Sequence, residues 1–221
     1  MPVVHAHPLS SFCWKLLIAL YESDLTFEYR QLNLGDEAER AAFRALWPIG
    51  KMPVWEGDEA GAALPETSII LEHLALTEPS PRWLLPEDPR AALEVRLRDR
   101  FYDLYVMMPM QQIVADRIRP AEHRDPFGVA RAKDALRTGF DLVETRFAPA
   151  PWAAGEAFSM ADCAAAPALF YANEVLPFGT THPKAAEYLA RISARPSFAR
   201  VLAEAAPYRH FFPRDPDEKA A

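Results

Sequence analysis

The sequence predicts an α/β domain followed by a separate all-α domain. Three observations lead to this fold class. Short strand patterns alternate with helical patterns over the first 80 residues, a proline-rich stretch follows, and every convincing pattern beyond it is helical. The 221 residues are therefore divided into a first domain at 1–78, a linker at 79–89, a helical domain at 90–212 and a frayed tail at 213–221.

The first domain is expected to run β-α-β-α-β-β-α along the chain. Its strand candidates are short runs that are apolar or alternate in polarity, and its helix candidates carry apolar residues on one stripe. A turn at Gly57–Asp58 separates the last two strands. The expected strands are Val3–Val4, Phe27–Leu32, Met52–Trp55 and Ala62–Leu64, and the expected helices are Ser10–Tyr21, Asp36–Leu46 and Thr67–Leu76.

The second domain contains only helix candidates. The chain has 21 prolines and 8 glycines, and this excess of proline indicates fixed helix starts and stops, not disorder. Ser159 and Asp162 form a Ser-x-x-Asp capping box before a nearly uncharged helix, and we expect its role to be structural. The expected helices are Arg90–Ile118, Pro126–Phe147, Met160–Leu176, Pro183–Ala194 and Ser197–Ala206.

Composition and charge exclude several classes of protein. The net charge is −7 and no run of Lys or Arg occurs, so no nucleic-acid partner is expected. The longest uncharged run, residues 1–14, is too short and too polar to cross a membrane. No secretory leader is recognisable, and Cys13 and Cys163 are too few for a disulfide framework, so we expect a cytoplasmic protein.

Two serines stand at the junction of the first strand and the first helix, in the segment Ser10–Lys15. In the simplest interpretation, one hydroxyl caps the helix. In the alternative, the free N–H groups and the helix dipole at this end stabilise an anion, such as a phosphate, a carboxylate or a thiolate. The segment alone does not decide between the two.

Two further segments are candidates for ligand binding. Pro53 opens a strand, and the bond that precedes it is either trans, as at an ordinary strand entry, or cis, which would expose the N–H and C=O of Met52 to a ligand. Glu66 and Thr67 precede an apolar helix. They are either a plain helix cap or a site where the hydroxyl and N–H of Thr67 hold a carboxylate.

Taken in this order and spacing, these segments resemble those of the cytosolic glutathione transferases. The likeness covers nearly the whole chain: a thioredoxin-like first half, the proline-rich linker, and a helical second half in which the capping box is followed by Arg195–Pro196–Ser197. The run Ser10–Leu20 is most similar to the serine-type enzymes, particularly the zeta class, with some tau character. The resemblance implies a homodimer that uses glutathione as co-substrate.

The resemblance also implies roles at the start of the first helix. Ser10 stands where these enzymes keep the hydroxyl that activates the glutathione thiol, and Ser11 is its neighbouring backup. Redox relatives have their reactive cysteine at that first position, whereas Cys13 lies three residues later. Disulfide exchange through Cys13 is therefore a lesser alternative to thiolate chemistry at Ser10.

The remaining glutathione contacts are implied in the same way. Lys51 matches a lysine that reaches a glutathione carboxylate, Met52 offers its backbone to the cysteinyl part, and Pro53 matches the cis-proline of the family. Glu66 and Thr67 match the acidic-hydroxyl pair that holds the γ-glutamyl end.

A pocket for a small, mostly apolar electrophile is expected between the two domains. Tyr102, Tyr105 and Met108 lie at helical spacing on adjoining positions of one face, which is typical of either a core stripe or a pocket wall. The resemblance makes the pocket interpretation as strong as the core one, because the family receives apolar substrates at this helix. His7 and Phe12 are expected to line the same pocket.

Other functions are less consistent with the sequence, and two alternatives stay open. His5 and His7 share a strand face without a third ligand nearby, so no metal site is expected. A serine hydrolase is disfavoured because no Gly-x-Ser-x-Gly motif occurs. A non-catalytic carrier or assembly module of the same fold and a zeta-type isomerase are the alternatives. Zeta isomerases usually have cysteine where Phe12 stands and Gln-Val-Pro where this chain has Lys51–Met52–Pro53.

Overall fold

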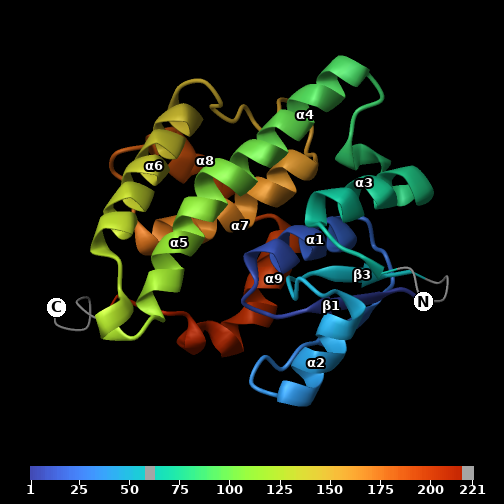
Figure 1. The fold of residues 1–221 in the computed structure, drawn as a ribbon. Coiled ribbons are helices and arrows are strands. Elements are labelled where there is room, and N and C mark those ends of the chain that lie inside the picture. Colours follow the sequence, from blue (N-terminus) through green and yellow to red (C-terminus); the bar gives the residue numbers. More distant parts are fainter. Residues whose placement is uncertain (58–62, 216–221) are drawn as a thin grey trace.

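The computed structural model describes residues 1–57 and 63–215 (Figure 1). Strands occur in the first part of the chain, and the part that follows the proline-rich segment is helical in the described residues. Of the expected turn at Gly57–Asp58 and the expected strand at Ala62–Leu64, Asp58 and Ala62 lie outside the described residues. The predicted fold class is confirmed.

One four-stranded mixed sheet forms the first domain, in the order β2-β1-β3-β4. β1 is parallel to β2 and antiparallel to β3, and β3 is antiparallel to β4. The parallel pair requires a crossover, which the first helix provides. The strands are β1 at Val3–Ala6, β2 at Glu28–Gln31, β3 at Val54–Glu56 and β4 at Ala63–Leu64.

The two faces of the sheet are covered by different helices: α1 (Ser11–Glu22) and α3 (Thr67–Thr77) lie on one face, and α2 (Glu37–Leu46) on the other (Figure 1). Because side chains alternate along a strand, Val4 packs into the α1 and α3 core, whereas Val54 packs with Phe43 of α2. This arrangement leaves the N-termini of α1 and α3 available for a site.

The second domain is a bundle of helices that packs on α1. Its α-helices are α4 at Pro89–Phe101, α5 at Met108–Arg117, α6 at Pro126–Glu144, α7 at Met160–Val175, α8 at Pro183–Ser193 and α9 at Pro196–Ala205. Short segments are η1 at Ser80–Leu84, η2 at Tyr102–Met107, η3 at Ala121–His123 and η4 at Ala206–Phe211. Within the described residues, none of these helices has the length and apolar character that crossing a membrane requires.

The single helix expected at 90–118 is interrupted by a π-helical turn, η2. There the N–H of Met108 donates to the carbonyl of Asp103, five residues earlier. Pro109 follows and has no N–H to offer the carbonyl of Tyr105, four residues before it. Gly139 of α6 lies so close to that carbonyl that a Cβ built on the glycine would be 2.7 Å from the oxygen. Two features therefore accompany the π-helical turn: the missing N–H of Pro109 and the close approach of α6 to the carbonyl of Tyr105.

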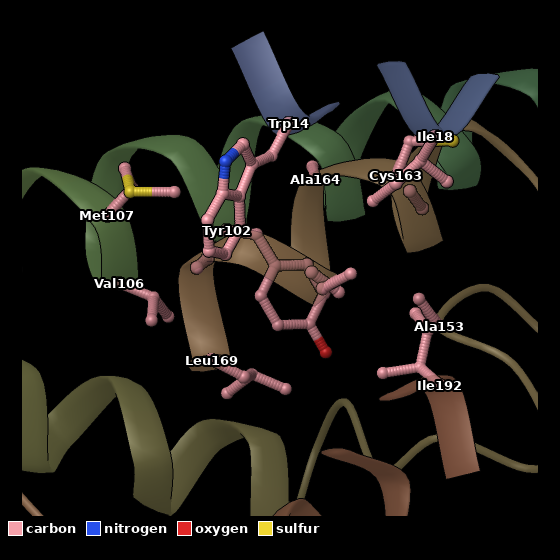
Figure 2. Close-up of a cluster of buried hydrophobic side chains, with 14 of the residues drawn as sticks. Trp14, Ile18, Tyr102, Val106, Met107, Ala153, Cys163, Ala164, Leu169 and Ile192 are labelled. Atoms are coloured by element: carbon pink, nitrogen blue, oxygen red, sulfur yellow. The ribbon is translucent and has the colours of Figure 1, made fainter. Parts of the chain in front are cut away.

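The interface between the two domains is part of the hydrophobic core. Trp14 and Ile18 of α1 lie among side chains of the helical domain, beside Tyr102 and Cys163 (Figure 2). The Trp14 ring lies 4.6 Å, centroid to centroid, from the ring of Tyr171. Burial of these large side chains holds the domains in one relative position.

Candidate functional site

A cavity of about 150 Å³ lies between the two domains, and we call it the interdomain cavity. The first domain contributes the N-terminal turn of α1, the segment before β3 and the N-terminal turn of α3. The helical domain contributes α4, the π-helical turn and the start of α5. The lining residues are Phe12, Trp47, Lys51, Met52, Pro53, Glu66, Thr67, Ser68, Arg100, Asp103, Leu104 and Met108. Five binding residues inferred from the sequence, Lys51, Met52, Pro53, Glu66 and Thr67, are thus brought together.

The segment before β3 offers hydrogen-bonding groups that the described protein does not use. Lys51 is exposed, and its ammonium group has no partner among residues 1–57 and 63–215. The Met52–Pro53 peptide bond is cis. In the same described ranges, neither the N–H nor the C=O of Met52 has a protein partner. An extended ligand backbone can therefore pair with Met52 while Lys51 approaches a carboxylate.

The N-terminus of α3 is open toward the same cavity. The residue before it, Glu66, has a left-handed backbone with φ of 69° and gives no side-chain cap. By contrast, α1, α2, α4 and α6 are each capped by the side chain of the residue that precedes the helix. The first N–H groups of α3 and the Thr67 hydroxyl are therefore available to a ligand. Free N–H groups at a helix N-terminus bind carboxylates well.

A buried ionic network forms the wall behind α3. Lys15, which is 1% exposed, lies 2.6 Å from Asp99 and 2.8 Å from Asp103. Its ammonium donates to the hydroxyl of Ser68 at 2.9 Å, and Ser68 donates to Asp99 at 2.6 Å. Arg100 lies 3.1 Å from Asp103 at the cavity edge.

The network changes the proton affinity of its members. Burial lowers the pKa of Lys15, but the carboxylates of Asp99 and Asp103 outweigh this effect and raise it above the ordinary value. Burial raises the pKa of Asp103, and Lys15 opposes that shift. Sequence reasoning did not assign these residues to the site. The signal was a lysine within an otherwise apolar helix and two aspartates four residues apart.

The serines at the start of α1 lie beside the interdomain cavity and are not among its lining residues. Ser10 is the N-cap, and its Oγ accepts a hydrogen bond from the N–H of Cys13 at 3.4 Å. The Ser10 hydroxyl also interacts with the Cys13 side chain, and this contact lowers the pKa of the thiol against the larger effect of burial. Ser11 is 5% exposed, and its Oγ accepts from the side chain of Gln111 at 3.4 Å.

Burial raises the pKa of the Cys13 thiol to about 12. The thiol is fully buried and therefore stays protonated near neutral pH. Nucleophilic attack and disulfide exchange require an accessible thiolate, so this environment favours a structural role for Cys13.

Comparison with known proteins gives the family of this chain. The model of the glutathione S-transferase N-terminal domain matches residues 4–82, and that of the C-terminal domain matches residues 126–191. Maleylacetoacetate isomerase of Rattus norvegicus is 30% identical over 173 residues, which are 75% of this chain and 76% of the isomerase. The chain belongs to the glutathione S-transferase family. The resemblance drawn from the sequence motifs is confirmed at the level of the family.

Other relatives of this chain match over most of their length. A glutathione S-transferase of Pseudomonas putida is 28% identical over 207 residues, 91% of each chain. A solved glutathione S-transferase of Methylobacterium radiotolerans, in complex with glutathione sulfonate, is 27% identical with a TM-score of 0.78 and covers 90% of this chain and 93% of its own. That of Methylobacillus flagellatus, with glutathione bound, has a TM-score of 0.82 at 22% identity, covers 91% and 98%, and shows the shared fold.

The expected electrophile pocket is only partly assembled in this chain. Phe12 and Met108 line the interdomain cavity. Tyr102 does not: it is fully buried in the core shown in Figure 2, so that part of the prediction is wrong. Tyr105 is 59% exposed and is not among the residues that line the cavity. His7 is half-buried and contacts the Tyr208 ring, also outside the cavity lining.

His5 of β1 and His7, which follows the strand, have separate surroundings. His5 Nε2 lies 2.9 Å from a carboxylate oxygen of Glu56, and the Nδ1 of His7 accepts from the N–H of Leu9 at 3.2 Å. Across residues 1–57 and 63–215, no group of three or more His, Cys, Asp or Glu side chains is arranged to hold a metal ion.

Proposed function

We propose that this chain is a glutathione transferase that binds glutathione in the interdomain cavity and conjugates it to a small, mostly apolar electrophile. The observation that carries the proposal is the set of unused groups around one cavity: the Lys51 ammonium, the Met52 backbone and the uncapped N-terminus of α3. Glutathione is a short peptide with two carboxylates, which these groups complement. The solved relative from Methylobacterium radiotolerans holds glutathione sulfonate.

Each part of the peptide has a proposed partner. The γ-glutamyl carboxylate binds the Thr67 hydroxyl and the N–H groups of α3, with Glu66 beside it. The cysteinyl backbone pairs with the N–H and C=O of Met52. The glycyl carboxylate lies toward Lys51. This orientation directs the thiol toward Phe12 and the N-terminus of α1.

Ser10 is the proposed group that stabilises the thiolate. Lowering a thiol pKa by two units requires about 2.7 kcal/mol of preference for the charged sulfur. A hydrogen bond from a hydroxyl to a charged group contributes roughly 1.5–3 kcal/mol. The N-terminus of α1 adds about 0.3–1 kcal/mol. These two contributions suffice without a general base, and Ser10 stands at the N-cap of α1, where both act.

The electrophile is proposed to enter on the apolar side of the cavity. Phe12 of α1, Trp47, and Leu104 and Met108 of the helical domain are the apolar residues that line this side. Aromatic and methionine side chains favour apolar, polarisable compounds. The cavity therefore combines a polar half for the peptide with an apolar half for its reaction partner.

The decisive experiment is a pH titration of bound glutathione by ultraviolet difference absorbance, which detects the thiolate. In the wild type, we expect the thiolate band well below the pKa of free glutathione. Ser10→Ala should shift it upward, and Ser11→Ala, the matched control, should shift it much less. Binding without a lowered thiol pKa would favour a carrier or assembly module, and absence of glutathione binding would reject the whole proposal.

A second candidate function is glutathione-dependent isomerisation of the zeta type. The 30% identity to the isomerase of Rattus norvegicus favours it. Assays with maleylacetone and with 1-chloro-2,4-dinitrobenzene on the same preparation separate the two activities. Isomerisation in the absence of conjugation would replace the first proposal.

We also propose that the protein forms a homodimer through α3 and α4. Apolar side chains are exposed on both helices: Ile69 (51%), Leu76 (84%), Leu93 (64%) and Leu97 (46%). The bidentate pair of Arg96 and Glu72, at 2.8 Å, joins the helices into one surface. Light scattering should give twice the monomer mass, and the double variant Leu93→Lys and Leu97→Lys should give a monomer. A monomeric wild type would contradict this assignment.

A further inference from the structure

A second cleft, of about 520 Å³, lies on the other side of α1, and we call it the α1–α9 cleft. Successive residues of a helix are rotated by roughly 100°. Phe12 therefore faces the interdomain cavity, whereas Leu17 and Tyr21 point the opposite way and line the cleft. The facing wall is formed by α9 and η4, and α9 lies close to α1 (Figure 1). Nothing in the proposed transferase reaction uses this space.

The α1–α9 cleft has an apolar floor and aromatic walls. Leu17, Val201 and Ala205 are buried at the bottom, with exposed fractions of 3% or less. The walls are formed by the rings of Tyr21, Phe27, Tyr29 and Tyr208. The volume is within the range of small-molecule pockets, roughly 300–1,000 Å³. Such walls suit an aromatic ring of similar size to the side chains that form them.

Charge at the cleft favours a cation. Its charged lining residues are Asp24, Arg200 and Glu204. Arg200 and Glu204 neutralise each other at 2.9 Å. Asp24 is exposed at the C-terminal end of α1 and has no partner among the described residues. The cleft therefore carries one uncompensated negative charge.

The aromatic wall already holds one cation in the structure. The guanidinium of Arg200 lies 3.8 Å from the centroid of the Tyr21 ring, within the range of a cation–π interaction. The Tyr21 ring is 6.0 Å from that of Phe27. The rings of Phe27, Tyr29 and Tyr208 are not covered by a cation of the described protein.

The three tyrosine hydroxyls of the cleft differ in their hydrogen bonding. The hydroxyl of Tyr208 donates to Gln31 at 3.1 Å, and that of Tyr21 donates to Glu204 at 2.6 Å. The Tyr29 hydroxyl, by contrast, has no hydrogen-bond partner in residues 1–57 and 63–215. Burial raises the pKa of Tyr29, so this group remains a neutral hydroxyl near pH 7. It can accept one hydrogen bond and donate another.

From these observations we propose that the α1–α9 cleft binds a small aromatic amine in its protonated form. The ring lies between Phe27, Tyr29 and Tyr208 over the apolar floor. The ammonium group points toward Asp24, and a ring N–H donates to the Tyr29 hydroxyl. This is a ligand site distinct from the interdomain cavity, since α1 separates the two. It does not depend on the proposed transferase function.

Tryptamine is the probe, and isothermal titration calorimetry of the full chain is the measurement. Tryptamine should bind, and indole-3-propionate, which has the same ring and the opposite charge, should bind at least about tenfold more weakly. Asp24→Asn should weaken tryptamine binding roughly three- to fivefold, the value of one partly exposed charge pair. Tyr29→Phe should weaken it roughly threefold.

Two controls make the result specific. Asn tolerates the left-handed backbone of Asp24, with φ of 50°, so Asp24→Asn preserves the fold. Glu37→Gln removes the same charge from α2, outside the cleft, and should leave affinity unchanged. Saturating glutathione should also leave it unchanged. Absence of tryptamine binding, equal binding of the acid, unchanged affinity in Asp24→Asn, or competition by glutathione would each overturn the proposal.

Discussion

The N-termini of α7 and α3 are opposite solutions to the same problem, because every helix begins with N–H groups that lack helical partners. At α7, the Asp162 carboxylate is fully buried and accepts from the N–H of Ala153 (2.7 Å), the N–H and hydroxyl of Ser159 (2.9 and 3.2 Å), and the hydroxyl of Tyr188 (2.5 Å). At α3, Glu66 gives no side-chain cap, and the helix start faces a cavity.

The difference between the two helix N-termini distinguishes polar groups that stabilise the fold from polar groups that can bind a ligand. The groups around Asp162 are consumed within the protein, so their free energy contributes to folding. Those around Thr67 and Lys51 are not used within the described protein, so under the proposed function their free energy becomes available when glutathione binds. Substitutions in the first region should therefore change stability, and substitutions in the second should change affinity.

The largest effect is expected for Asp162→Ala. Removing the carboxylate leaves buried N–H and O–H groups without partners, which should lower the free energy of unfolding by roughly 3–5 kcal/mol. Guanidinium denaturation followed by circular dichroism measures this loss. The glutathione affinity of the folded fraction should not change. A loss below about 1 kcal/mol would show that the capping box is not the main support of α7.

The next effect is expected at the open helix start. Thr67→Ala should raise the glutathione Kd roughly tenfold, because a hydrogen bond to a charged carboxylate is lost. Thr67→Ser retains the hydroxyl and is the matched control. Calorimetric titration gives the Kd, and the free energy of unfolding should change by less than about 1 kcal/mol. An unchanged Kd in Thr67→Ala would remove this residue from the site.

Alkaline pH provides a third comparison, through the hydroxyl of Tyr102, which is buried in the folded protein and titrates only when the protein unfolds. Burial raises the pKa of Tyr102, so the folded protein keeps a proton that the unfolded chain loses above about pH 10. Stability is therefore present below that pH and falls as pH rises, by up to about 1.4 kcal/mol per pH unit for one group.

Tyr102→Phe should remove this contribution. We expect the decrease in unfolding free energy between pH 10 and 11 to be roughly 1 kcal/mol smaller in the variant than in the wild type. Urea denaturation at the two pH values measures it. Parallel pH dependence of the two proteins would indicate that the Tyr102 hydroxyl does not keep its proton through burial.

The smallest effect is expected for Lys51→Gln. The Lys51 ammonium is exposed, so its attraction to a glutathione carboxylate is worth about 0.5 kcal/mol, or a two- to threefold increase in Kd. The difference should shrink at high salt, because exposed charges are screened. If the loss of glutathione affinity did not depend on salt, the charge of Lys51 would not be the cause of the loss.

The sequence patterns predicted the order of elements well because local chemistry determines it. Asp36 before α2 and Ser10 before α1 are ordinary N-cap residues, and both cap their helices in the structure. The capping box at Ser159 and Asp162 is also present. In these cases, a few neighbouring residues contain the whole signal.

The helical face around Tyr102 could not be predicted in the same way. A projection at 100° per residue assumes an uninterrupted α-helix, and the π-helical turn at Tyr102–Met107 breaks that register. Its causes include the packing of Gly139 against a carbonyl more than thirty residues away in sequence. Similarly, the pairing of Lys15 with Asp99 and Asp103 joins residues distant in the chain, which periodicity does not reveal.

The Lys15 network couples the unfolding of the two domains. Lys15 belongs to the first domain, and the aspartates that neutralise it belong to the second. If one domain melted alone, the other would expose the apolar surface around Trp14 and lose the partner of a buried charge, a cost of several kcal/mol. Heating should therefore produce one cooperative calorimetric transition. Cutting the chain at the proline-rich linker should yield two fragments that are unstable apart.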